Sequence, residues 1–160
     1  MLPYYNSSMS SVDDSNNTGM ETQAISHSAG FLEREHTADW ELEVWAPDLG
    51  GLFEQAALGM HALCGARLAE APRLSRTFDI SGDSPEALLV HFLSDLLYLA
   101  EQEGMGFNQF QIEVEGNRLR ATANGGLLTS IGKEIKAVTF HNLEIKRSER
   151  GLEACIVFDV

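Results

Sequence analysis

Residues Leu152–Val160, with the sequence LEACIVFDV, form an apolar segment rich in residues that favour β-strands. The segment predicts a packed strand that is still running where the sequence stops. Such a strand end would hold the Asp159 carboxylate and the Val160 α-carboxylate close together. Two anions held close together repel unless a cation or a basic side chain lies between them. The segment therefore prompts a search for a third acidic group, and Asp39 is the best candidate.

Two helices are expected upstream of this strand. Asp48 or Leu49 begins the first, whose apolar side chains recur at the helical period on one face. Ser84-Pro85-Glu86 is a strong start for the second, with Ser as N-cap and Pro at the first helical position. Gly104 and Gly106 are expected to end that helix.

The remaining apolar segments alternate with a period of two and predict strands. Gly116-Asn117 predicts a two-residue hairpin turn, and Ser148–Gly151 is expected to close a last hairpin between Ala137–Lys146 and Leu152–Val160. The order of elements predicts an α+β domain in which two helices pack on a largely antiparallel sheet.

Residues 1–30 contain no Lys or Arg and are rich in Ser, Asn, Thr and Gly. Such a segment buries too little apolar area to offset its ordering entropy, so it predicts a flexible N-terminal tail before one domain at residues 31–160. A tail that rests on the domain through Tyr4 and Tyr5 is the alternative. No secretory signal and no run approaching ~20 apolar residues is present, which predicts a cytoplasmic protein without a membrane span. Cys64 and Cys155 fit no metal or redox spacing and are expected to be free thiols.

The formal net charge of −13 argues against a large phosphate-binding surface, because nucleic-acid binders usually carry a basic patch. The one local concentration of bases, at Lys133, Lys136, Lys146, Arg147 and Arg150, is more typical of a solvated hairpin. An acidic protein that acts on RNA is better suited to dock on a basic RNA-handling enzyme than to grip RNA itself.

The block His36-Thr37-Ala38-Asp39 has a structural and a functional interpretation. From the residues alone a turn is favoured, in which Asp and Thr side chains bond nearby backbone N–H groups. Most short His/Asp clusters are structural, which favours the turn. A metal site is the alternative.

Several blocks, in order along the chain, resemble the archease family. They are Glu35–Asp39, Leu52–Ala57, Glu86–Leu89, Lys133–His141 and Phe158–Val160. Each block is short, but the ordered set is specific, and the resemblance extends over residues 31–160.

Resemblance to archease implies a metal-binding cofactor protein, not itself an enzyme, that activates an RtcB-type GTP-dependent RNA ligase in tRNA splicing or RNA repair. It implies that Asp39, Asp159 and the Val160 carboxylate hold the metal. All three are oxygen donors, so Ca²⁺ is the best fit, with Mg²⁺ or Mn²⁺ as alternatives. The ligase rather than this chain would bind GTP, and RNA would be contacted only indirectly.

His36, Lys136 and His141 are weaker candidates, for contact with the partner. His36 is more simply interpreted as a hydrogen-bonded core histidine, His141 as part of a half-buried strand, and Lys136 as a lysine that snorkels or pairs with a carboxylate. The segment Gly126–Lys133 fails as a P-loop, because its spacing is one residue too long and Glu134 replaces the required Ser or Thr. It also departs from the archease pattern.

Two other functions stay open: a small metal-dependent phosphoesterase, and an assembly chaperone for an RNA-modifying enzyme. The sequence has no hydrolase motif, and only His36 and Lys136 could supply acid–base chemistry beside a metal.

Overall fold

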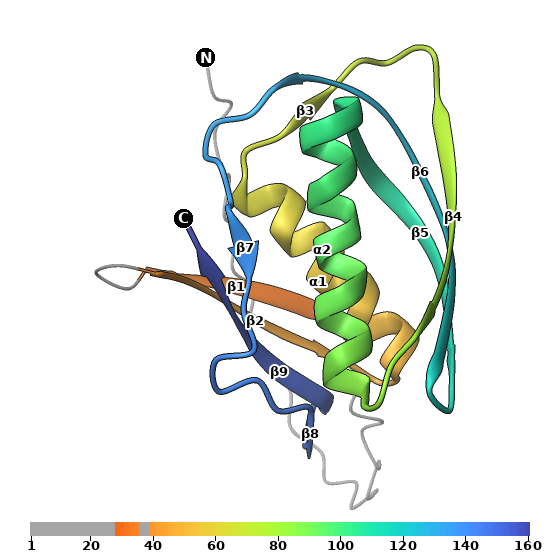
Figure 1. Ribbon diagram of the computed structural model, residues 1–160. Coiled ribbons are helices and arrows are strands. Elements are labelled where there is room, and N and C mark those ends of the chain that lie inside the picture. Colours follow the sequence, from red (N-terminus) through yellow and green to blue (C-terminus); the bar gives the residue numbers. More distant parts are fainter. Residues whose placement is uncertain (1–27, 36–38) are drawn as a thin grey trace, which may run out of the picture.

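Two antiparallel sheets enclose two helices in the computed structural model, which describes residues 28–35 and 39–160 (Figure 1). The predicted N-terminal tail lies almost entirely outside the described residues, as does His36. All pairings between the described strands are antiparallel, so the predicted α+β class is confirmed.

The first sheet brings the two ends of the described chain together, because the late strand β9 lies between the early strand β2 and the late strands β7 and β8. The strands are β1 (Gly30–Glu35), β2 (Asp39–Ala46), β7 (Ala137–Val138), β8 (Lys146–Ser148) and β9 (Gly151–Asp159). Alternate side chains of β2 and β9 face the core, led by Leu42, Val44, Ile156 and Phe158, which are all fully buried. The other side chains of these strands form the outer face of the first sheet.

The second sheet is built around the long strand β6, which pairs with the other three strands. Its strands are β3 (Arg67–Leu68), β4 (Leu74–Ser81), β5 (Met105–Glu115) and β6 (Arg118–Ser130). The predicted turn at Gly116-Asn117 joins β5 to β6, and Gly116 has a φ of 56° that suits glycine. Because β6 runs to Ser130, most of the segment considered as a P-loop is strand.

The two helices begin where the sequence predicts. Helix α1 (Leu49–Leu63) is capped by Asp48, whose carboxylate accepts from the Gly51 N–H at 2.7 Å. Helix α2 (Pro85–Glu103) is capped by the Ser84 hydroxyl and ends at Gly104, which has a φ of 64°. Helix α1 contacts β1 and β2 of one sheet and β5 of the other, while α2 contacts β4, β5 and β7. The helices therefore fill the space between the two sheets (Figure 1).

One predicted strand is wrong. Residues 137–146 do not form a single strand, because pairing stops after Val138 and resumes at Lys146. Thr139 turns its hydroxyl onto the Val157 carbonyl at 2.9 Å, and Asn142 takes a left-handed conformation with a φ of 51°. Short polar side chains that bond the backbone compete with strand pairing in this way. The result is a turn, which we call the 139–143 turn.

Candidate functional site

The pairing of β2 with β9 sets Asp39 directly opposite Asp159. Residues opposite each other on antiparallel strands share a face and have Cβ atoms about 4.5–5.5 Å apart. Both aspartates are exposed. The fold thus brings together two of the predicted metal ligands, at one end of the outer face of the first sheet. We call Asp39 and Asp159 the acid pair.

Backbone and packing contacts hold this end of the sheet in place. The Lys136 N–H donates to the Asp159 carbonyl at 2.8 Å, which ties β7 to β9 at the acid pair. Next to Asp39, Trp40 carries the Lys133 ammonium 3.5 Å from its ring centroid. The Val160 side chain packs partly buried against the core. The acid pair therefore lies on an anchored strand end.

The chemistry of the acid pair suits a hard cation. Carboxylates are the ligands that Ca²⁺ and Mg²⁺ prefer, and Mg²⁺ is often bound through one or two carboxylates with water completing the shell. Within residues 28–35 and 39–160, no three His, Cys, Asp or Glu side chains gather closely enough to hold a metal ion. The side-chain donors present are thus the two aspartates, and they fit an oxygen-coordinated ion rather than zinc.

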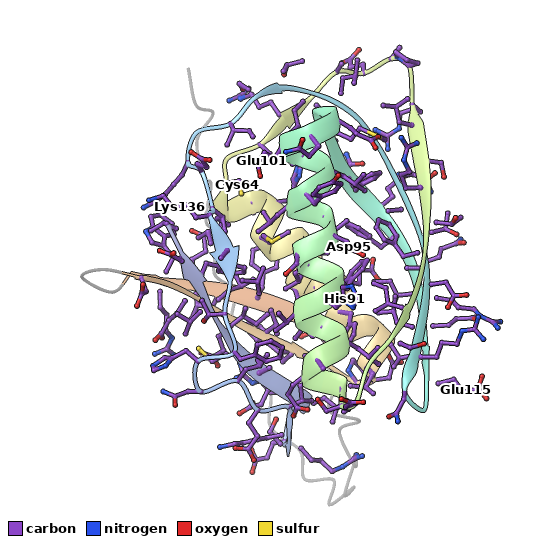
Figure 2. All side chains as sticks on the ribbon, in the orientation of Figure 1. Cys64, His91, Asp95, Glu101, Glu115 and Lys136 are labelled. Atoms are coloured by element: carbon purple, nitrogen blue, oxygen red, sulfur yellow. The ribbon has the colours of Figure 1, made fainter. Side chains whose placement is uncertain are left out.

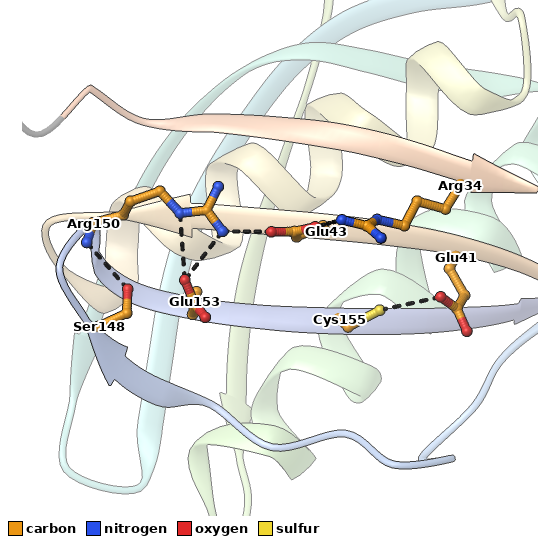
Figure 3. Close-up of polar contacts among 7 residues, drawn as sticks. All are labelled: Arg34, Glu41, Glu43, Ser148, Arg150, Glu153 and Cys155. Atoms are coloured by element: carbon orange, nitrogen blue, oxygen red, sulfur yellow. Dashed lines mark hydrogen bonds and ion pairs between the residues drawn. The ribbon is translucent and has the colours of Figure 1, made fainter.

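A charged network occupies the same outer face (Figure 3). Arg150 bonds Glu43 and also Glu153, with 3.1 Å between its Nη2 and Glu153 Oε2, while Arg34 donates to Glu43 at 2.8 Å. Arg150 also stacks over Trp45, 4.3 Å from the ring centroid. The sequence analysis missed this network. Its signal was the alternation of Glu with core residues along β2, but finding the partners requires the strand order.

The pKa of a network carboxylate and the pKa values of both cysteines are shifted. The hydrogen bond from Arg150 lowers the pKa of Glu43 against the opposing effect of burial, and Arg34 lowers it further. Burial raises the pKa of the Cys155 thiol to about 11, and the neighbouring Glu41 carboxylate adds to the effect. Burial likewise raises the pKa of Cys64 to about 11. Both cysteines are free, as predicted, and their thiols stay protonated near neutral pH.

The predicted partner-contact residues have different settings. Lys136 is exposed beside the end of β9 (Figure 2). His141 is exposed in the 139–143 turn, where its Nε2 lies 3.2 Å from the Asn142 Nδ2, so the predicted half-buried strand position is wrong. His36 lies outside the described residues. In the chain, Lys136 precedes β7 and His141 follows it, and both side chains are accessible from solvent.

Comparison with known proteins identifies the family. The sequence profile of the Archease protein family matches residues 31–160. The chain belongs to the archease family. Protein archease of Thermococcus gammatolerans is 34% identical over 126 residues, which cover 73% of this chain and 88% of the relative. Protein archease of Methanosarcina mazei is 33% identical over 135 residues, covering 79% and 92%.

Solved structures of relatives have the same architecture. The crystal structure of an archease from Thermotoga maritima, described as a possible chaperone, aligns with a TM-score of 0.61 and 26% identity, covering 79% of this chain and 94% of that one. The solution structure of protein 1598 from Methanobacterium thermoautotrophicum gives a TM-score of 0.60 at 26% identity, covering 82% and 99%. Archease membership supports a chaperone-like or cofactor-like role. None of the helices in the described part of the chain is long and apolar enough to span a membrane.

Proposed function

We propose that this protein is a non-enzymatic, metal-binding cofactor protein that activates an RtcB-type GTP-dependent RNA ligase. In this role it promotes guanylylation of the ligase and repeated turnover in tRNA splicing or RNA repair. The observation that carries the proposal is the acid pair, Asp39 opposite Asp159, in a chain of the archease family. Two like charges placed opposite each other destabilise a strand pair, and a bound cation would relieve that repulsion.

Asp39 and Asp159 would hold the ion, with the Val160 α-carboxylate as the third oxygen donor. Ca²⁺ is the proposed ion, and Mg²⁺ and Mn²⁺ are alternatives with the same preference for oxygen. The ion supplies positive charge that neutralises the carboxylates and can polarise a phosphate oxygen. Lys136 and His141, exposed on either side of β7, and His36 would contact the partner.

The charge of the chain favours docking on a protein over direct grip on RNA. With a net charge of −13, the surface attracts a basic RNA-handling enzyme and repels phosphates. GTP would accordingly bind the ligase, with RNA contacted only through it. By binding the guanylylation-competent conformation of the ligase more tightly than other conformations, this protein would raise the population of that conformation. The two free thiols fit the reducing cytoplasm.

Reconstitution with purified ligase, RNA and GTP tests the proposal. Wild-type protein should convert the ligase from single to multiple turnover, and Asp39→Ala should lose most of that stimulation while melting normally in chelator. In thermal melts, the cation at a hundredfold excess over its dissociation constant should stabilise the wild type by about 2.7 kcal/mol, and Asp39→Ala should lose this gain. Glu70→Ala, an exposed carboxylate in the loop between β3 and β4, is the matched control.

The competing functions give different results in the same assays. A phosphoesterase would hydrolyse a generic phosphodiester by itself, whereas the proposed cofactor protein should be inert until ligase is added. Full stimulation by Asp39→Ala, or a wild-type melt that does not respond to any of the three cations, would overturn the metal-dependent role. A C-terminal extension after Val160 tests the third donor, because it removes the free carboxylate from that position.

A further inference from the structure

The 139–143 turn presents an aromatic side chain to solvent from a fixed backbone. Phe140 is 60% exposed. On one side of it, the Thr139 N–H and hydroxyl both donate to the Val157 carbonyl, at 3.0 and 2.9 Å. On the other side, the Leu143 N–H donates to the Phe140 carbonyl at 3.1 Å, and the left-handed Asn142 completes the turn. The main chain at Phe140 is thus held from both directions.

A fixed backbone changes what an exposed aromatic can do. A single exposed apolar residue is ordinary on a protein surface and needs no explanation. Binding, however, costs the ordering of loops and side chains at the interface, and a pre-organised aromatic avoids most of that cost. Aromatic residues, Phe among them, are enriched at protein–protein interfaces relative to the rest of the surface. Phe140 thus combines a highly exposed side chain with a backbone held by hydrogen bonds.

The position of Phe140 connects it to the acid pair. Ala137 lies opposite Asp159, and Phe140 is three residues further along the chain, so the Cα atoms of Ala137 and Phe140 are at most about 10 Å apart at ~3.3 Å per extended residue. Asn142, in the same turn, lines a shallow hollow together with residues of the outer face of the first sheet, among them Glu43, Glu153 and Cys155. The turn, the hollow and the acid pair therefore form one continuous surface.

This surface is acidic. Its carboxylates are Asp39, Glu41, Glu43, Glu144, Glu153 and Asp159, and its basic side chains are Arg34, Lys136, Lys146 and Arg150. Three of these basic side chains, Arg34, Lys146 and Arg150, already contact a carboxylate of the same surface. A partner that fits here is a protein with basic side chains around the point where Phe140 would enter.

We propose that Phe140 is the anchor residue of the partner interface and inserts into an apolar socket with a basic rim on the surface of the partner protein. The inference rests on the proposed function, because it takes the ligase as that partner. It adds an apolar contact that does not depend on the cation. The anchor sets the affinity, and the acid pair acts once the partner is docked.

A second exposed aromatic serves as the matched control. Tyr98 is 61% exposed and lies on α2 (Figure 2 labels His91, Asp95 and Glu101 on the same helix). Phe140→Ala and Tyr98→Ala remove aromatic side chains of nearly equal exposure from different parts of the surface. Because both side chains are mostly solvated, both variants should keep the melting temperature of the wild type.

Binding of each variant to immobilised ligase, with the cation present, tests the anchor. Phe140→Ala should weaken the affinity at least tenfold, Phe140→Leu should retain part of it, and Tyr98→Ala should match the wild type. The cation-dependent melting shift of Phe140→Ala should be that of the wild type. Raising the salt concentration should weaken wild-type binding, because the socket rim is basic.

The outcomes separate the anchor from the function. If wild type stimulates the ligase and Phe140→Ala binds as tightly as wild type, the anchor is wrong and the proposed function stands. Equal losses of affinity for Phe140→Ala and Tyr98→Ala would also overturn it, because a specific anchor at Phe140 predicts no loss when the aromatic side chain on α2 is removed. If the wild type itself does not bind the ligase, the anchor and the proposed function fall together.

Discussion

The outer faces of the two sheets both carry paired opposite charges, and they differ at the end of the first sheet where the acid pair lies. In the second sheet, Arg120 lies opposite Asp79 on one side and opposite Glu113 on the other. Next to it, Arg118 lies opposite Glu115 and donates to Asp79 at 2.7 Å. In the first sheet, Asp39 lies opposite Asp159. Opposite charges facing each other stabilise a strand pair, and like charges destabilise it.

The difference between the two sheets distinguishes a structural pattern from a functional one. This fold can place compensating charges on an exposed sheet face, since the second sheet does so along β6. The acid pair is therefore not imposed by the architecture. Arrangements that cost stability and persist are found at functional sites, where the cost is offset by a ligand or by activity.

The largest effect is expected when the acid pair is given the pattern of the second sheet. Asp159→Lys places a cation opposite Asp39. Without added metal, the variant should melt roughly 2–4 °C above the wild type, because a repulsive pair becomes attractive. Its cation-dependent shift and its stimulation of the ligase should both be lost. Differential scanning calorimetry with Ca²⁺ and with chelator measures this.

Glu70→Lys is the control, since it makes the same change of charge away from the acid pair. It should keep both the cation-dependent shift and the stimulation. A variant Asp159→Lys that still gains stability from Ca²⁺ would show that the ion binds elsewhere.

An effect on stability alone, with no loss of function, is expected from giving the second sheet the pattern of the first. Arg120→Glu would create a row of three carboxylates across β4, β6 and β5, with Asp79 and Glu113 on either side. We expect the melting temperature to fall by roughly 2–5 °C, and to recover in part at high salt. Stimulation of the ligase should not change. A loss of stimulation with an unchanged melting temperature would place function on the second sheet instead.

The smallest effect concerns how the free energy of unfolding decreases at acidic pH. The pKa of Glu43 is lowered in the folded protein, so the folded state holds that proton less tightly than the unfolded state. The resulting stabilisation is present above the ordinary Glu range and is lost as the pH falls below about 4.5 through the lowered value. Arg150→Ala removes the largest cause of the shift, so its free energy of unfolding should fall less steeply between pH 5 and pH 3.

Urea unfolding at several pH values measures that slope. The control is Arg73→Ala, because Arg73 donates to the Asn108 amide, which does not titrate. Arg150→Ala should also lose a constant amount at every pH, from its contact with Trp45. Identical slopes for wild type and Arg150→Ala would show that the hydrogen bond from Arg150 does not contribute to the pH dependence.

Local signals in the sequence predicted the helices and the hairpin well. Asp48, Ser84-Pro85 and Gly104 act within a few residues, and each lies at the predicted helix end. The break at Thr139–Leu143 was missed because the apolar alternation continues through Leu143 and Ile145. The decisive contact there, from the Thr139 hydroxyl to the Val157 carbonyl, joins segments of different strands. Local pattern cannot reveal it.

The candidate site was likewise predicted only in part. The strand end at Asp159 and the resemblance to archease predicted that Asp39 and Asp159 share one site, and the alternation along β2 and β9 was visible in the sequence. That the two residues are opposite each other depends on the register of β2 with β9, which a shift of one residue would undo. The network of Arg34, Glu43 and Arg150 depends on the same register and was missed. Long-range pairing is the information that the sequence pattern lacked.

The position of β9 has a consequence for the order of events during synthesis. Asp39 and Asp159 are more than a hundred positions apart, so at about 5–20 residues per second the ribosome makes β2 several seconds before β9. Until β9 inserts between β2 and the 137–148 segment, the long edge of β2 stays unpaired and the two carboxylates are apart. A growing chain therefore has no acid pair to offer a cation, and only a chain with β9 in place does.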